Sequence, residues 1–354
     1  MPETIHIDGS QGEGGGQILR TSLALAALLR QPVEIDNIRA NRAQPGLKTQ
    51  HLAGVLALAG ITAAEVKGAH KHSTRLAFAP RTIKGGRYRF EIATAGSASM
   101  LFGAVLPALL FAPQSSDVTI TGGTHVPFSP PFHYLDKVFL PGLRRLGGLV
   151  DLELVRWGFY PKGGGEIRAH VNPCSGLQGL QLAERGKLKS LQLSACSSDS
   201  LPDHIARREI AHVEMRLDRQ IDRLSAKTLT CRALSPGNFV FLEADYEHAT
   251  TGFSALGKRG KPAEEVAEDA YRSFNDFEKT AATVDSHLAD QLILYAALAQ
   301  GDSFFVVEKV TSHLTTNIAV IRKFLPVNID LDITTGQVSI KGTGHNHLNN
   351  ASVR

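Results

Sequence analysis

The stretch EKVTSHLTTNIAVIRKFLP, residues 308–326, decides the fold because it places a strand directly before a helix. The preceding run, Ser303 to Val310, is rich in aromatic and β-branched residues, which favour a strand. Apolar residues then recur at the spacing of a helix with one buried face; they are Ile318, Val320, Ile321, Phe324 and Leu325. His313 is therefore expected at or near a helix N-terminus.

A helix N-terminus offers unpaired backbone N–H groups and the positive end of the helix dipole. Both favour a bound phosphate, and both disfavour a protonated imidazole. His313 is thus a candidate nucleophile for chemistry on phosphorus. The alternative is that Thr311, Ser312 or His313 merely caps the helix.

The composition is that of an ordinary globular protein. The 354 residues, 43% hydrophobic and 20% charged, can bury a large core in about two domains. A net charge of +4 permits an anionic partner without requiring one. The three cysteines are widely spaced and form no CxxC pair, which argues against a disulfide framework or a structural zinc site. With no export signal and no long charge-free apolar run, we expect a cytoplasmic protein without a membrane span.

One order of elements recurs three times along the chain: a helix, a strand, a second helix and further strands. The copies begin near Gln17, Ser97 and Leu288. In each copy the first strand leads into a short polar junction before the second helix; the junctions are RANRAQPG, TGGTHVPFSPP and KVTSHL. The repeat predicts that these three junctions converge at one site.

The repeat predicts an α/β (α+β) fold of three repeated βα units, each with a small sheet and two helices. Residues 1–185 and 281–340 are expected to form this discontinuous body. Residues 186–280 interrupt it with a pattern of strand, helix, strand and helix, which predicts an inserted small α/β domain. Residues 341–354, rich in histidine and asparagine, are expected to be a disordered tail.

The glycine-rich loop DGSQGEGGGQILR, residues 8–20, precedes the first predicted helix. Its glycines would let backbone N–H groups approach a phosphate, Glu13 could hold Mg²⁺, and Arg20 could meet an anion one turn into the helix. A tight turn into a helix explains the same glycines. The loop alone therefore leaves both interpretations open.

Basic side chains gather in RANRAQPGLKTQH, residues 39–51, around a Pro-Gly turn. Arg39 and Arg42 could grip phosphates with their guanidinium forks, and Gln50 and His51 could reach ribose hydroxyls or base edges. This segment is the best candidate for binding a nucleic-acid end or another polyanion. A solvated basic turn is the alternative.

The third copy opens with SHLADQL, residues 286–292. Spacings of three and four place His287, Asp290 and Gln291 on one helical face, where a ring, a carboxylate and an amide could hold a nucleotide. Polar residues at a helix start also serve as caps, so that interpretation stays open.

Together these segments resemble the RNA 3′-terminal phosphate cyclase family, over nearly the whole chain to about Ile340. The resemblance rests on DGSQGEGGGQILR (8–20), IRANRAQPGL (38–47), GFYPKGGGEI (158–167), LADQL (288–292) and SHLTTNIAVIRKFLP (312–326). It implies three repeated α/β units like those in the C-terminal domain of a bacterial translation initiation factor, with a small thioredoxin-like insertion. It also implies the cyclase branch, because a related ribosome-assembly branch lacks the histidine that matches His313.

The resemblance implies a ligase that converts an RNA 3′-phosphate to a 2′,3′-cyclic phosphate with ATP. His313 matches the nucleophile that becomes a covalent AMP-histidine, and Glu13 matches the acid that binds Mg²⁺ or Mn²⁺. The nucleotide-binding positions match His287, Leu288, Ala289, Asp290, Gln291 and Arg20. The positions associated with the RNA end match Arg39, Arg42, Gln50 and His51.

Three positions depart from the family pattern. Gly103 stands where the family often has a glutamine, His287 where it often has a tyrosine, and Trp157 where it usually has a basic residue. Two other classes of protein stay open: a non-catalytic RNA-binding ribosome-assembly factor on the same scaffold, and an enolpyruvyl-type small-molecule transferase. The sequence leaves the oligomeric state open.

Overall fold

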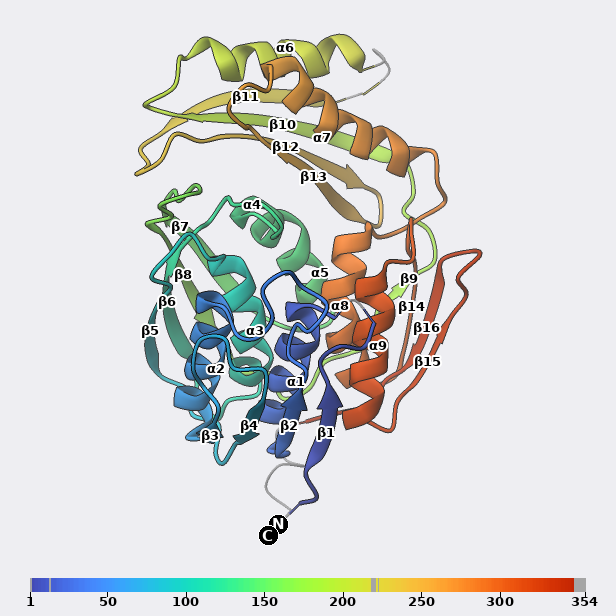
Figure 1. Cartoon of the computed structure of the whole chain (residues 1–354). Helices are drawn as coiled ribbons and strands as arrows, with labels where there is room; N and C mark the ends of the chain where they lie inside the picture. The colour runs from blue at the N-terminus through green and yellow to red at the C-terminus, as the bar shows by residue number, and fades with distance from the viewer. Residues whose placement is uncertain (1, 13, 218–220, 222, 347–354) are drawn as a thin grey trace.

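This computed structural model contains three copies of one six-element unit. Their helices pack together in the middle of the body, and their sheets lie outside (Figure 1). The structure describes residues 2–346 except 13, 218–220 and 222. The first unit comprises β1 (Ile5–Asp8), α1 (Gly16–Leu29), β2 (Val33–Asp36), α2 (Thr49–Thr62), β3 (Glu65–Lys67) and β4 (Leu76–Ala79). Each unit has the order strand, helix, strand, helix, strand, strand.

The second and third units follow the same order. The second comprises β5 (Arg87–Glu91), α3 (Ala98–Leu110), β6 (Ser116–Gly122), the broken helix α4 (Phe132–Tyr134), η1 (Leu135–Phe139) and α5 (Leu140–Arg145), then β7 (Val150–Arg156) and β8 (Gly165–Val171). The third comprises β9 (Gln181–Leu182), α8 (Ser286–Leu298), β14 (Asp302–Val306), α9 (Ser312–Phe324), β15 (Asn328–Leu331) and β16 (Gln337–Lys341).

Sheet topology confirms the internal repeat. The strand orders are β1-β2-β4-β3, β5-β6-β8-β7 and β9-β14-β16-β15, so matching strands occupy matching places. In each sheet the first two strands are parallel, and the remaining neighbours are antiparallel. The predicted fold class, an α/β body of three repeated βα units with a further small α/β element, is confirmed.

The helices of the three units pack against one another inside the three sheets (Figure 1). α1 contacts α2, α3 and α9, and it is buried almost all round from Ile18 to Leu28. A helix that is apolar on every side belongs in a core rather than at a surface. The loops that precede α1, α2 and α9 all lie at the end of the body that faces the fourth sheet (Figure 1).

The fourth sheet is inserted between β9 and α8 of the third unit. It has the order β11-β10-β12-β13, made of β10 (Leu188–Ser198), β11 (Leu224–Cys231), β12 (Asn238–Tyr246) and β13 (Thr250–Leu256). Its helices α6 (His204–Arg216) and α7 (Ala263–Glu278) cover the face turned away from the body (Figure 1). The domain boundaries at 186 and 280 and the likeness to thioredoxin stay predictions.

Two predictions about these segments need correction. The expected strand, helix, strand and helix omitted β11 and β13, which lie at the two edges of the sheet. β11 is largely exposed, so its sequence lacks the apolar alternation that marks a half-buried strand. The disordered tail was expected from residue 341, but Lys341 ends β16, and the backbone N–H groups of residues 342–345 donate hydrogen bonds to carbonyls near the end of α8 and in the following turn. Residues 347–354 lie outside the described residues.

Within the described part of the chain, no helix is both long enough and apolar enough to cross a membrane.

Candidate active site

The start of α9 is capped by Thr311, not by His313. Thr311 Oγ1 accepts a hydrogen bond from the backbone N–H of Leu314 (3.0 Å) and donates one to Asp290 Oδ1 (3.0 Å). His313 follows in the first turn, half-buried, and its ring makes no hydrogen bond to any residue that the structure describes. Within the described part of the chain, no side chain or backbone group occupies the ring nitrogens of His313.

Side chains from three other segments of the chain lie close enough to the His313 ring to change its pKa. Burial lowers the pKa of His313, and the neighbouring Arg20, His287 and Arg42 lower it further. These side chains come from α1, from the start of α8 and from the junction between β2 and α2. The imidazole is thus neutral at pH 7, and positive groups stand around it, as a nucleophile for an anionic substrate requires.

A partly buried network of hydrogen bonds joins α1, α8 and α9 beside this histidine. Arg20 Nη2 donates to Gln17 Oε1 (2.6 Å), and Gln17 Nε2 donates to Asn317 Oδ1 (2.9 Å). Asn317 lies one turn after His313, and its Nδ2 donates to the backbone carbonyl of Asp290 (2.9 Å). Burial lowers the pKa of Arg20 to about 10, so it is still charged at pH 7.

The start of α2 carries a second histidine with a different role. His51 is buried, and its Nδ1 accepts a hydrogen bond from the backbone N–H of Lys48 (3.1 Å) at the helix N-terminus. Burial lowers the pKa of His51 to about 3, helped by the charges of Arg20, Arg39 and Lys48. A Cβ on Gly16 would lie 2.5 Å from His51 Nε2, so a larger residue at this position would require the buried His51 ring to shift.

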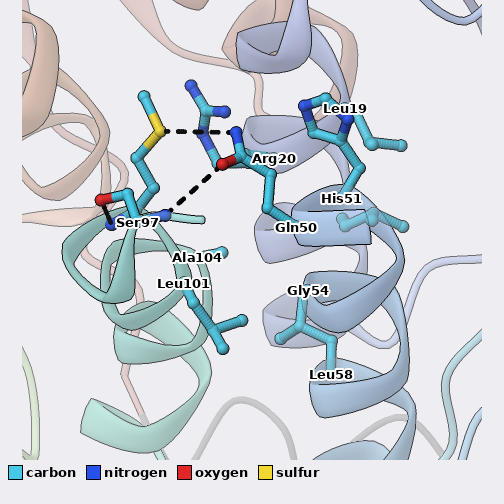
Figure 2. A pocket seen from close by; sticks show the side chains of 11 residues that line it. Leu19, Arg20, Gln50, His51, Gly54, Leu58, Ser97, Leu101 and Ala104 are labelled. Atoms are coloured by element: carbon cyan, nitrogen blue, oxygen red, sulfur yellow. Dashed lines mark hydrogen bonds between the residues drawn. The ribbon is translucent and has the colours of Figure 1, made fainter. Parts of the chain in front are cut away.

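Arg20, Gln50 and His51 meet at the polar end of a small recess between α1, α2 and α3 (Figure 2). Gln50 Oε1 accepts a hydrogen bond from the backbone N–H of Ser97 (3.4 Å), which ties the second unit to the first. The recess has a volume of about 20 Å³, room for one water molecule. It is too small to hold a nucleotide, so a bound nucleotide would have to lie outside this recess.

The two arginines of the first junction have different environments. Arg39 is buried with a left-handed backbone (φ 56°), and its Nη1 donates to the carbonyls of Gln44 (2.7 Å) and Gly46 (2.9 Å). Its guanidinium therefore shapes the loop from within. Arg42 is exposed and lies close enough to His313 for its charge to lower the pKa of that ring.

The start of α8 is capped by buried Asp285. Its Oδ1 accepts from the backbone N–H groups of His287 and Leu288 (both 3.0 Å) and from the Tyr134 hydroxyl (2.5 Å). Of the predicted nucleotide-binding positions, His287 is exposed and Gln291 half-buried. The side chains of Leu288 and Ala289 belong to the core, so only their backbone could serve a ligand.

Asp290 is the one acidic residue of α8, and it contacts the cap of α9. Its pKa is raised to about 7, chiefly by burial; the hydrogen bond from Thr311 opposes this rise, and the nearby Asp285 contributes to it. Asp290 therefore links the cap of α9 to α8. Its carboxyl can change its charge near neutral pH. Sequence reasoning offered Thr311 only as a possible helix cap and missed Gln17 and Asn317 as partners in this arrangement, although a lone Asn on the buried face of a helix is a signal of a polar contact.

The glycine-rich loop lies against α9. Gly12 has a left-handed backbone (φ 56°), and a Cβ there would lie 2.3 Å from Thr316 Oγ1 in α9. Glu13, the predicted metal ligand, lies outside the described residues. Among the residues that are described, no group of three or more His, Cys, Asp or Glu side chains could hold a metal ion.

The second junction holds a histidine that is locked in place. His125 is 1% exposed, its ring stacks on Trp157 with centroids 4.2 Å apart, and its Nε2 lies 2.9 Å from His133 Nδ1. Trp157, at a position where a basic residue was expected, thus serves packing. A Cβ on Gly103 would meet nothing within 4 Å, so this position leaves open space. The junction approaches the site through Tyr134, whose ring centroid is 6.1 Å from that of His287.

The fold and site define an α/β protein of three repeats in which helix starts from the first and third units surround a neutral histidine. The family model described as RNA 3'-terminal phosphate cyclase matches residues 11–331. The chain is 43% identical over 347 residues to the RNA 3'-terminal phosphate cyclase of Pyrobaculum aerophilum, covering 97% of this chain and 99% of that protein. It is 47% identical over 326 residues to the one of Ralstonia nicotianae, covering 92% of each. The chain belongs to the RNA 3′-terminal phosphate cyclase family.

Among solved structures, an EPSP synthase from Acinetobacter baumannii is 13% identical with a TM-score of 0.34, covering 98% of this chain and 66% of that chain. A similarity this low carries no argument about the function of the chain.

Proposed function

We propose that this protein converts the 3′-terminal phosphate of RNA to a 2′,3′-cyclic phosphate at the expense of ATP, through a covalent AMP on His313. The support is the environment of His313: a neutral ring in the first turn of α9, relieved of capping by Thr311, with Arg20 and Arg42 beside it. Family membership and the names of the similar proteins support the same reaction and substrate. We expect the reaction to take place in the cytoplasm.

The proposed reaction has three steps. A nitrogen of His313 attacks the α-phosphorus of ATP, the bond to the β-phosphate oxygen breaks, and pyrophosphate leaves. An oxygen of the RNA 3′-phosphate then attacks the same phosphorus and breaks the P–N bond, so that AMP passes to the RNA end. The vicinal 2′-hydroxyl finally attacks the 3′-phosphorus, loses its proton and expels AMP as the ring closes.

The surrounding residues suggest a division of labour. Arg20 and Arg42 lie close enough to His313 to lower its pKa, and they are candidates to stabilise the charge of the α-phosphate and of the RNA phosphate. Asp290 and Gln291 are candidates for the ribose hydroxyls, and exposed His287 for the base. Gln50 and His51 are candidates for the RNA end, whereas Arg39 shapes the loop that carries Arg42.

A divalent cation, Mg²⁺ or Mn²⁺, would neutralise phosphate charge and help pyrophosphate to leave. Glu13 remains its proposed ligand. Because Glu13 lies outside the described residues, the steps above are written through His313 and its described neighbours alone.

Incubation with α-labelled ATP and a divalent metal tests this proposal. The label should remain on the protein, whereas γ-labelled ATP should leave none. A phosphoramidate resists alkali and breaks in acid, so the stability of the label reports which atom holds it.

His313→Asn is the matched control variant. Asparagine keeps a polar side chain in the first turn and cannot form the adenylate, so labelling and cyclisation of a 3′-phosphorylated oligoribonucleotide should both disappear. If wild-type protein never takes up label, or if His313→Asn labels like wild type, the catalytic proposal is wrong. Such a protein would be better explained as a non-catalytic RNA-binding assembly factor.

A further inference from the structure

Phe128 is the most exposed of the large apolar side chains that the structure describes. It lies in the second junction, TGGTHVPFSPP, with 98% of its surface exposed and with a left-handed backbone (φ 62°). A left-handed backbone is unfavourable for any residue with a Cβ. An aromatic ring that stays exposed to water contributes no hydrophobic stabilisation to the fold. Both features work against folding, so stability does not explain the choice of phenylalanine here.

The loop that carries Phe128 is held firmly at both ends. The backbone N–H groups of Thr124 and His125 donate to the carbonyl of Gly158 (2.9 and 3.1 Å), and that of Phe132 donates to the carbonyl of Thr124 (3.0 Å). Prolines at 127, 130 and 131 restrict the backbone further. The ring is therefore displayed by a constrained loop, which reduces the entropy lost when something packs against it.

The position of the loop relates it to the proposed site. Phe128 precedes by six residues Tyr134, whose hydroxyl donates to the α8 cap Asp285 and whose ring approaches His287. Six residues span at most about 20 Å when fully extended. His287 in turn lies close enough to His313 to lower the pKa of that ring. The ring is thus within reach of a polymer whose end lies at His313.

Two lysines lie near the helix that follows the loop. Lys137 and Lys227 are close enough to His133 to help burial lower its pKa to about 4, and Lys137 also pairs with Asp136 (3.0 Å). A single-stranded nucleic acid combines phosphates that such cations attract with bases whose flat faces stack on aromatic rings.

We propose that Phe128 is a stacking platform for a nucleobase near the 3′ end of the RNA. This inference rests on the proposed function, because it takes the RNA end to lie at His313. Phe128 is a substrate-positioning residue in this scheme and takes no part in the bond-making steps.

Binding of a 3′-phosphorylated oligoribonucleotide, followed by fluorescence anisotropy, tests the inference. Phe128→Ala should weaken binding about fivefold or more, as expected for the loss of one stacked base, and should raise KM with little change in kcat. Phe128→Trp should retain or strengthen binding. Phe128→Gly separates structure from function: it relieves the left-handed backbone, so the melting temperature should rise while RNA binding weakens.

Ile333→Ala is the matched control, because Ile333 is also largely exposed (76%) but lies in the turn between β15 and β16. It should leave binding unchanged. The sharper test replaces each of the last nucleotides in turn by an abasic residue. Wild type should lose affinity at one position, and Phe128→Ala should be insensitive to the abasic residue at that same position.

The two proposals fail in different ways. If wild-type protein neither labels with α-labelled ATP nor cyclises RNA, the proposed function is wrong. If wild type does both, but Phe128→Ala and Phe128→Gly bind every oligoribonucleotide as wild type does, the stacking inference is wrong and Phe128 serves another contact, such as a protein partner.

Discussion

The first turns of α2 and α9 are equivalent places in the first and third units, and each carries a histidine with a different fate. His51 is buried and accepts a hydrogen bond from the backbone N–H of Lys48, so it holds its own helix start together. His313 is half-buried, and Thr311 caps its helix instead. The difference teaches that a repeat supplies the place, and that the neighbouring cap decides whether a histidine there is structural or free to react.

The largest expected effect comes from removing each histidine in turn. His313→Ala should reduce labelling by α-labelled ATP below detection while changing the free energy of unfolding by less than about 1 kcal/mol, because its ring holds no cap. His51→Ala should lower the free energy of unfolding by about 1–2 kcal/mol, because the Lys48 N–H loses its partner, and should retain measurable label. Labelling and urea unfolding on the same samples check both outcomes, and the comparison breaks if the two variants behave alike.

The cap that frees His313 can be removed by Thr311→Val. The variant loses the bond to the Leu314 N–H, about 1 kcal/mol, and leaves the Asp290 carboxyl without its donor, about 1–3 kcal/mol more. The free energy of unfolding measured in urea should therefore fall by about 2–4 kcal/mol. Thr311→Ser keeps both bonds and should recover most of the loss. Equal stability of the valine and serine variants would show that Thr311 is not the cap that matters.

The buried His51 of α2 should make the protein less stable in acid. The folded-state pKa of His51 is about 3 and the unfolded value about 6.5. Between these values the unfolded chain binds a proton that the folded chain refuses, so stability falls as the pH drops from about 6.5 towards 3. His125 and His133, whose pKa values are also lowered, act in the same direction, and Asp290, with its pKa raised to about 7, acts in the opposite one.

His51→Gln isolates this contribution. The slope of the unfolding free energy against pH, measured in urea between pH 6 and 4.5, should decrease by up to about 1.4 kcal/mol per pH unit relative to wild type. His313→Gln should change the slope less, because that ring is only half-buried. An unchanged slope in His51→Gln would mean that His51 takes up its proton without resistance.

The smallest effect concerns the two arginines of the first junction. Arg42→Ala should weaken RNA binding and reduce the slope of log affinity against log salt by about one, the value for one lost phosphate contact. Arg39→Ala should act mainly on stability, because its guanidinium holds the carbonyls of Gln44 and Gly46. Binding at several salt concentrations and urea unfolding separate the two. Matching salt slopes for Arg42→Ala and wild type would reduce Arg42 to a solvated side chain.

Local patterns in the chain were enough to predict the three repeats, the order of their elements from the first helix onward and the presence of His313 at the start of a helix. They did not predict the strand that opens each unit, β1, β5 or β9. Hydrophobic periodicity, turn residues and junction lengths are properties of short windows of sequence, and they do not depend on what packs above them. The same reasoning failed at β11, where an exposed edge strand carries no such periodicity.

Only the tertiary structure decided which residues are free to act. The link from Arg20 through Gln17 to Asn317 joins residues about 300 positions apart, and the pKa of His313 depends on Arg20, Arg42 and His287 from three other segments. Burial likewise separated Leu288 and Ala289 from their polar neighbours on α8. Charge, burial and hydrogen bonding are set by groups brought together in space. The sequence by itself could therefore name the histidine and predict a neutral ring, but not which side chains from distant segments would surround that ring.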